Sequence, residues 1–288
     1  MTETKYCYRH PDRETGLSCS DCGRPICVDC MTVAPVGIRC PEHAGARPRQ
    51  TPRPVRTVQR TSARQGIMIR TDAIVTRVLI AINLAVYLVG ISQGGGINNP
   101  GGELFRRLWL DGYDVSHGGW WRLITAAFLH ASIIHIAFNM LALWWLGSPI
   151  ETVLGWWRYL LLYIASGLAG SAGALIFSPD KVTVGASGAI FGMLGAGLIL
   201  EWRATGSLAG NYLTLIVINL AISFAVPNIS VGGHVGGLIG GAAATLAFSR
   251  FGRGHAAYGR LGVIGATGLA AIAVASVLIS YWKVGGLA

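Results

Sequence analysis

Two polar residues at the starts of apolar segments could together carry out acyl-transfer chemistry. Ser187 lies in the run Gly185-Ala186-Ser187-Gly188, and His234 lies at the start of another apolar segment. A serine hydroxyl is a poor nucleophile near pH 7 and needs a base to take its proton, most often an imidazole. Ser187 and His234 therefore supply a nucleophile and a general base, provided that the fold brings them together.

A second pair of polar residues could stabilise the negative charge that develops during such a reaction. His135 and Asn139 are four residues apart, so a helix presents both on one face. Facing lipid would be unfavourable for both, so we expect them to point into a helix bundle. With the backbone N–H of Ser187 they form a set of donors for an oxyanion. The alternative is that these groups only hold helices together, as polar and small residues do in membranes.

The residues around His234 allow a close approach of helices. Gly237 and Gly241 lie on the helix face of His234, and Gly188 removes side-chain bulk beside Ser187. The site would work as a Ser-His dyad without an acidic third member. We therefore expect packing to orient His234, with Phe191 as the candidate neighbour.

The first 46 residues offer metal chemistry of a different kind. All six cysteines lie there, and with two histidines they form four pairs, each separated by two residues. The pairs are Cys7 with His10, Cys19 with Cys22, Cys27 with Cys30, and Cys40 with His43. This spacing predicts two closed tetrahedral zinc sites, which are structural rather than catalytic. A disulfide scaffold is the alternative, but the histidines and a reducing cytoplasm argue against it.

The composition indicates that the segments that carry Ser187 and His234 lie in a membrane. Hydrophobic residues make up 52% of the 288 residues and charged residues only 12%. Seven apolar runs are long enough to span a bilayer as helices, which predicts an all-α polytopic membrane protein. The runs are 73–92, 123–147, 159–177, 184–202, 208–226, 231–249 and 261–282. If the spans alternate in direction, the second, fourth and sixth start on the same side, so Ser187 and His234 can meet.

Composition separates three regions, which are a zinc-binding module over 1–46, a basic flexible linker over 47–70, and a membrane domain from residue 71 onward. Within the membrane domain we expect a six-helix core over 71–250, followed by a loop and a seventh transmembrane helix over 251–288. The linker carries seven arginines and no acidic residue, which places the N-terminus in the cytoplasm and the C-terminus outside it. We expect a solvated linker and no nucleic-acid partner, while contact of the linker with anionic lipid stays open.

Several motifs together resemble those of the rhomboid family of intramembrane serine proteases, across residues 71–250. They are Trp121-Arg122, the run from His130 through His135 to Asn139-Met140, Gly185-Ala186-Ser187-Gly188, and His234-Val235-Gly236-Gly237. The resemblance implies that Ser187 and His234 form the catalytic dyad and that His135, Asn139 and the Ser187 N–H line the oxyanion site. It also implies a supporting role for His130 and a reaction that needs no catalytic cofactor. The implied substrates are transmembrane proteins in the lipid bilayer. Phe191 departs from the tyrosine that bacterial relatives often have there.

The N-terminal pairs resemble the cross-braced ligands of B-box and RING-like modules. That resemblance implies one zinc on Cys7, His10, Cys27 and Cys30, and a second on Cys19, Cys22, Cys40 and His43. Such a module could hold a cytoplasmic protein partner. Modules and extra spans of this kind resemble those of rhomboids from high-GC Gram-positive bacteria, which implies a bacterial inner membrane.

Three other functions compete with proteolysis. A noncatalytic rhomboid-like protein would bind membrane clients, although such relatives characteristically lose the serine or the histidine. A transporter would show matching interrupted spans in two halves, and the sequence shows no such pair. A metalloprotease would need a His-Glu-x-x-His pattern within the spans, which the sequence lacks.

Overall fold

The computed structural model describes residues 5–33, 37–44, 73–248 and 263–287. The chain divides into two compact units, Met1–Gly66 and Ile67–Ala288, and each is described by itself. The predicted linker over 47–70 lies outside the described residues, as does most of the loop predicted after residue 250.

The N-terminal unit is small and is built around its cysteines. Its elements are β1 (Tyr6–Cys7), β2 (His10–Glu14), η1 (Val28–Cys30), β3 (Thr32–Val33) and β4 (Ile38–Arg39). Strand β1 pairs with β2 and β3 with β4, both antiparallel. The interior consists of Ile26 and five buried cysteines, so there is little apolar core to hold the fold by itself.

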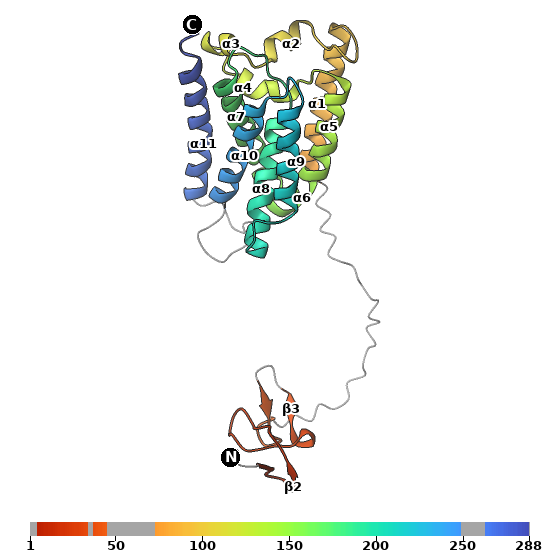
Figure 1. Cartoon of the computed structure of the whole chain (residues 1–288), viewed down its shortest axis with the longest axis vertical. Coiled ribbons are helices and arrows are strands. Elements are labelled where there is room, and N and C mark those ends of the chain that lie inside the picture. The colour runs from red at the N-terminus through yellow and green to blue at the C-terminus, as the bar shows by residue number, and fades with distance from the viewer. Residues whose placement is uncertain (1–4, 34–36, 45–72, 249–262, 288) are drawn as a thin grey trace, which may run out of the picture. The chain divides into compact units, whose positions relative to one another are not determined.

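The second unit is a bundle of helices (Figure 1). Its longer helices are α1 (Ile74–Gln93), α5 (Ile133–Ala142), α7 (Trp156–Phe177), α8 (Ser187–Thr205), α9 (Asn211–Ala225), α10 (Val231–Phe248) and α11 (Val263–Val284). Its short elements are α2 (Gly102–Leu108), α3 (Gly112–Ser116), α4 (Arg122–Thr125), η2 (Ala126–Phe128), η3 (Leu143–Gly147) and α6 (Ser148–Leu154). The helices α2, α3 and α4 gather at the end of the bundle where α11 ends (Figure 1).

The helical membrane architecture predicted from composition is confirmed, with a correction to the spans. Among the described residues, five helices are long and apolar enough to cross a membrane. They are α1, the continuous stretch Ile133–Leu154, α7, α10 and α11. The other two predicted runs also form helices, but α9 has only 15 residues and α8 ends in a turn that carries Arg203.

The second predicted span begins later than the apolar pattern indicated. Residues 122–128 form α4 and η2, the backbone is extended at Leu129, and α5 begins only after Ser132. The Ser132 hydroxyl accepts the His135 N–H, which caps the new helix. After α5 the helix continues through a π-helical turn, Leu143–Gly147, into α6. Pro149 follows that turn and lacks the N–H that an α-helical hydrogen bond there would need.

Glycines bring α10 against α8 at the centre of the bundle. A side-chain carbon added to Gly237 would overlap the carbonyl of Gly188, and one added to Gly241 would overlap the carbonyl of Gly192. Helix α10 also packs along α7, where Gly173 and Gly236 meet in the same way. Backbone contact of this kind fixes the relative position of the helices that carry Ser187 and His234.

Candidate active site and metal sites

Ser187 is the first residue of α8, and the turn before it requires glycine. Gly185 has φ +123°, a conformation that other residues rarely adopt. A side-chain carbon there would lie 2.7 Å from His135 Nε2 and 3.8 Å from Ser187 Oγ. The serine hydroxyl and the His135 ring therefore lie on the same side of this turn. The N–H groups of the first turn of α8 point out of the helix end, without partners inside the helix.

His234 is buried in the first turn of α10, with 7% of its surface exposed. Its ring stacks on Phe191, with the centroids 4.0 Å apart and the planes 16° from parallel. The contact is the one for which the sequence suggested Phe191. Between the described residues Ser187 and His234 there is no hydrogen bond in this arrangement. Instead, His234 Nδ1 lies 2.6 Å from the hydroxyl of Ser223 on α9.

His135 and Asn139 lie on one face of α5, as their spacing predicts. The Ala131 N–H donates to His135 Nδ1 at 3.4 Å, so the hydrogen of a neutral ring lies on Nε2. That nitrogen is the one beside the Gly185 turn. The Asn139 amide donates to the His135 carbonyl at 2.9 Å and keeps a second hydrogen to donate. Asn139 is buried, and His135 is partly buried.

His130 lies behind His135 and does not reach Ser187 through any hydrogen bond. It is 1% exposed, and both ring nitrogens lack a hydrogen-bond partner within the described part of the chain. Its ring meets the His135 ring edge-on at 5.0 Å. His130 thus limits how the His135 ring can turn.

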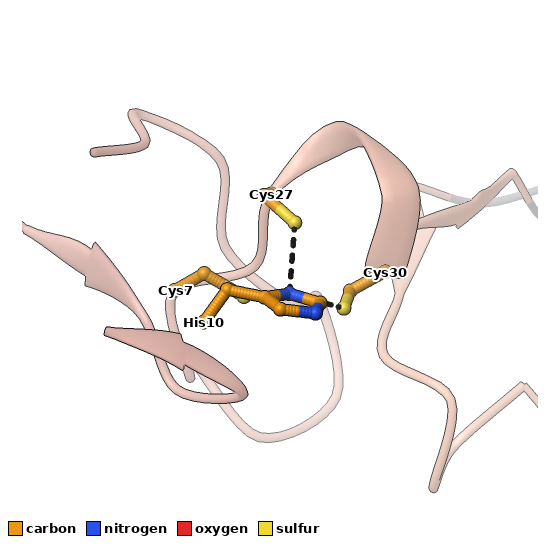
Figure 2. A group of neighbouring side chains, drawn as sticks. All are labelled: Cys7, His10, Cys27 and Cys30. Carbon is orange, nitrogen blue, oxygen red and sulfur yellow. Dashed lines mark hydrogen bonds between the residues drawn. The ribbon is translucent and has the colours of Figure 1, made fainter. Parts of the chain in front are cut away.

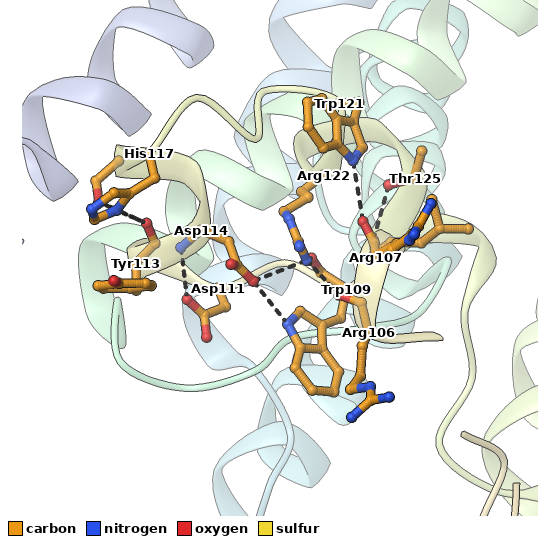
Figure 3. Close-up of polar contacts among 12 residues, drawn as sticks. Arg106, Arg107, Trp109, Asp111, Tyr113, Asp114, His117, Trp121, Arg122 and Thr125 are labelled. Atoms are coloured by element: carbon orange, nitrogen blue, oxygen red, sulfur yellow. Dashed lines mark hydrogen bonds and ion pairs between the residues drawn. The ribbon is translucent and has the colours of Figure 1, made fainter. Parts of the chain in front are cut away.

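Arg122 organises the segment between α1 and α5 (Figure 3). Its guanidinium donates to the carbonyls of Arg106 and Trp109, at 2.8 and 2.9 Å, and pairs with Asp114 at 3.1 Å. The Trp121 indole donates to the Arg107 carbonyl at 3.1 Å. These bonds join α2, α3 and α4, and a bond from the Gly185 N–H to the Ala126 carbonyl connects this region to the turn before Ser187.

The N-terminal unit gathers its eight Cys and His side chains into two groups, Cys7-His10-Cys27-Cys30 and Cys19-Cys22-Cys40-His43. In the first group, His10 Nδ1 lies 3.8, 3.4 and 3.3 Å from the sulfurs of Cys7, Cys27 and Cys30 (Figure 2). Ligand atoms on a tetrahedral zinc are about 3.3–3.8 Å apart, given bonds of about 2.0–2.3 Å. Both groups could therefore hold a metal ion.

The thiols are available as ligands. All six cysteines are free, and five of them are buried. The contact of the His10 ring with the Cys7 sulfur raises the pKa of His10 above its usual value. Metal ligation needs the neutral imidazole and the thiolates, so metal binding at this group would release protons.

One residue of the site was missed by the sequence reasoning. Ser223 contacts the ring of His234, yet a serine in an apolar helix usually bonds only to the preceding turn of its own helix. The sequence does show a hydroxyl 11 residues before His234, in the preceding apolar segment. The sequence does not show which face of α9 meets α10, so it could not predict that the hydroxyl contacts His234.

Comparisons with known proteins agree with the fold and the motifs. A model of the rhomboid domain matches residues 117–251. The chain is 40% identical over 186 residues to rhomboid protease GluP of Bacillus subtilis, covering 62% of the chain and 36% of GluP. It is 38% identical over 144 residues to YdcA of the same bacterium, also named as a rhomboid, covering 46% of the chain and 72% of YdcA.

A plant protein is also similar to the chain. RHOMBOID-like protein 1 of Arabidopsis thaliana is 40% identical over 127 residues, which cover 42% of the chain and 32% of that protein. The chain belongs to the rhomboid family. It is a multi-pass membrane protein, and it spans only about a third of the length of GluP.

Proposed function

We propose that this protein is an intramembrane serine endopeptidase, with Ser187 as nucleophile and His234 as general base. The observation that carries the proposal is the arrangement around the start of α8. One turn after Ser187, Phe191 stacks on the His234 ring, while His135 Nε2 lies beside the turn that precedes Ser187. The proposed base thus packs on a residue of the first turns of α8, and the proposed oxyanion donor lies beside the turn before α8, which supports the proposal.

The chemistry follows from these positions. His234 Nε2 takes the proton of Ser187 Oγ as that oxygen attacks the carbonyl carbon of the substrate peptide bond. The resulting oxyanion accepts from His135 Nε2, the Asn139 amide and the Ser187 N–H. The C–N bond then breaks, and His234 gives the proton to the leaving amine. A water molecule then attacks the acyl-serine while His234 takes a proton from it. The bond to Ser187 Oγ breaks, His234 returns the proton to that oxygen, and Ser187 is restored.

The substrates would be membrane proteins cut in or near a transmembrane segment. By analogy with the family, small residues beside the cut bond and helix-destabilising residues nearby would be preferred. The arginines of residues 47–70 support a cytoplasmic N-terminus and insertion into the bacterial inner membrane. Because α1 starts and α11 ends at opposite ends of the bundle, the end of α11 would then lie toward the extracytoplasmic side (Figure 1).

The two Cys3His groups would each bind one structural zinc ion. The donor set and the ligand spacing support this choice, because Cys and His are the usual ligands of tetrahedral structural zinc. Each group offers four protein ligands and leaves no position open for water. The module would serve to hold a cytoplasmic protein partner, and it takes no part in peptide-bond cleavage.

The test is cleavage of single-span reporter proteins by the purified protein in liposomes. The parent should cut, whereas Ser187→Ala and His234→Ala should lose at least about 10³-fold in rate while keeping the parent's melting temperature. If the parent cuts none of several diverse reporters, the activity is refuted. The protein would then be a membrane-client-binding relative, and binding of the uncut reporters would show it.

A further inference from the structure

Ser223 occupies an unusual place on α9. In this 15-residue helix the buried side chains are Ile216 and Ser223, so the remaining residues are at least partly exposed at the surface of the bundle. Ser223 is 3% exposed, and its hydroxyl points toward α10. Ser223 is thus one of the two buried residues of α9, and its hydroxyl has a partner on the next helix, the His234 ring.

The two hydrogen bonds of the Ser223 hydroxyl each have a defined direction. The Ser223 hydroxyl donates its one hydrogen to the Asn219 carbonyl, at 2.7 Å. It can therefore only accept from His234, whose Nδ1 lies 2.6 Å away. The hydrogen of the neutral imidazole must then lie on Nδ1. The bonds run from the ring through the hydroxyl to the backbone of α9.

This arrangement fixes what the ring can do. With its hydrogen on Nδ1, His234 has a lone pair on Nε2, and that nitrogen can act as a base. The Phe191 ring fixes the plane of the imidazole but cannot choose between its two nitrogens. The Ser223 hydroxyl makes that choice, which in other serine hydrolases belongs to a carboxylate.

We propose that Ser223 is a positioning residue that sets the tautomer and the rotation of His234, as a neutral third member behind the Ser187–His234 pair. The inference rests on the function proposed above, and it adds a residue from a helix that carries none of the other site residues. Movement of α9 away from α10 would withdraw the hydroxyl and release the ring.

The first test compares the kinetics of variants of the full-length protein in liposomes. Ser223→Ala should lower kcat roughly 10- to 100-fold and leave KM nearly unchanged, because the hydroxyl acts on the base rather than on the substrate. Ser223→Thr keeps the hydroxyl and should recover most of the rate. The matched control is Ser276→Ala on α11, since Ser276 is also buried and also donates to the carbonyl four residues earlier, but makes no hydrogen bond to any histidine among the described residues. It should retain the parent rate.

The second test reads the tautomer without using activity. Nitrogen NMR of histidine-labelled protein, assigned with His234→Gln, should show His234 protonated on Nδ1 in the parent and in Ser223→Thr. In Ser223→Ala the Nε2-protonated form should appear. An unchanged tautomer together with an unchanged kcat in Ser223→Ala would overturn the proposal. A parent that cleaves nothing would refute the proposed function instead, and the NMR result would still decide the role of Ser223.

Discussion

The rings of His135 and His234 have hydrogen-bond partners that give them opposite forms. His135 accepts the Ala131 N–H on Nδ1, which leaves Nε2 as a donor. His234 donates from Nδ1 to Ser223, which leaves Nε2 as an acceptor. One ring is thereby suited to stabilise an oxyanion and the other to remove a proton. The difference lies in the partners, because the two side chains are the same.

Replacing Gly185 with alanine tests the turn that holds these groups. The positive φ would be strained, and the new carbon would lie 2.7 Å from His135 Nε2, displacing the ring. We expect Gly185→Ala to destabilise the fold by about 1–3 kcal/mol and to reduce cleavage at least about 100-fold. Thermal melting and reporter cleavage, both in the same detergent, measure the two effects.

The control for that variant is Gly206→Ala at the end of α8. Gly206 also has a positive φ, +76°, but a carbon there meets open space. It should cost about 1 kcal/mol and leave cleavage at the parent rate. Equal losses of activity in both variants would mean that strain alone, rather than the contact with His135, explains the effect.

Phe191 allows a second test at this scale. Phe191→Tyr keeps the stacked ring and should retain activity within about threefold, whereas Phe191→Ala removes the ring and leaves a cavity against His234. We expect Phe191→Ala to lose at least about tenfold in kcat and about 3 kcal/mol of stability. Activity of the alanine variant at the parent level would show that stacking does not orient His234.

At the scale of elements, carboxylates stabilise the starts of two helices. Glu151 on α6 accepts the backbone N–H groups of Val75 and Thr76, at 2.9 and 2.8 Å, and is 3% exposed. Glu201 on α8 accepts those of Asn211 and Tyr212 at the start of α9, both at 3.1 Å. A negative charge at these ends satisfies N–H groups that have no partner within the helix.

Glu151→Gln should therefore destabilise the bundle. The substitution preserves size, but it removes the charge and turns an NH2 group toward N–H donors. We expect a loss of about 2 kcal/mol, measured as a lower melting temperature of the membrane unit. Glu103→Gln on α2 is the control, because its ion pairs with Arg106 and Arg107 are exposed and should contribute under about 1 kcal/mol. Equal melting temperatures for the two variants would contradict this role of Glu151.

The sequence predicted helices better than it predicted their ends. Long apolar runs located the helices, because a bilayer demands such runs. The predicted start of the second span at residue 123 was wrong, because the largely apolar residues 123–128 lie in α4 and η2, and the backbone is extended at Leu129 and at Ser132 before α5 begins. Residue types likewise suggested Ser187, His234, His135 and Asn139. Ser223 was not predicted, because its role depends on which face of α9 meets α10, and spacing within one helix does not show that.

At the scale of the whole molecule, the two units are held by different forces. The membrane unit has a large apolar cluster that includes Leu143, Tyr159 and Met193, together with backbone contacts between glycines. The N-terminal unit has Ile26 and its cysteines, and its side-chain ion pairs, such as Arg24 with Glu42, are exposed. Exposed pairs contribute little to stability. We therefore expect the smaller unit to depend on the proposed zinc ions for folding, and the larger one to fold without them.

Chelation should separate the two units. We expect two zinc ions per chain by elemental analysis of the purified protein, and one in Cys22→Ser or in Cys27→Ser, since each variant breaks one group. A strong chelator should abolish the protease resistance of residues 5–44. The melting temperature of the membrane unit should stay within about 2 °C of that of the untreated protein.

We expect chelator-treated protein to cleave a reporter as the untreated protein does. Because both groups are closed by four protein ligands and lie in the other unit, removing zinc should leave the rate unchanged within about twofold. The matched control is treatment with the chelator already saturated with zinc. A large loss of cleavage, restored by zinc but not by magnesium, would show that the N-terminal module acts on the membrane unit and that the two are not independent.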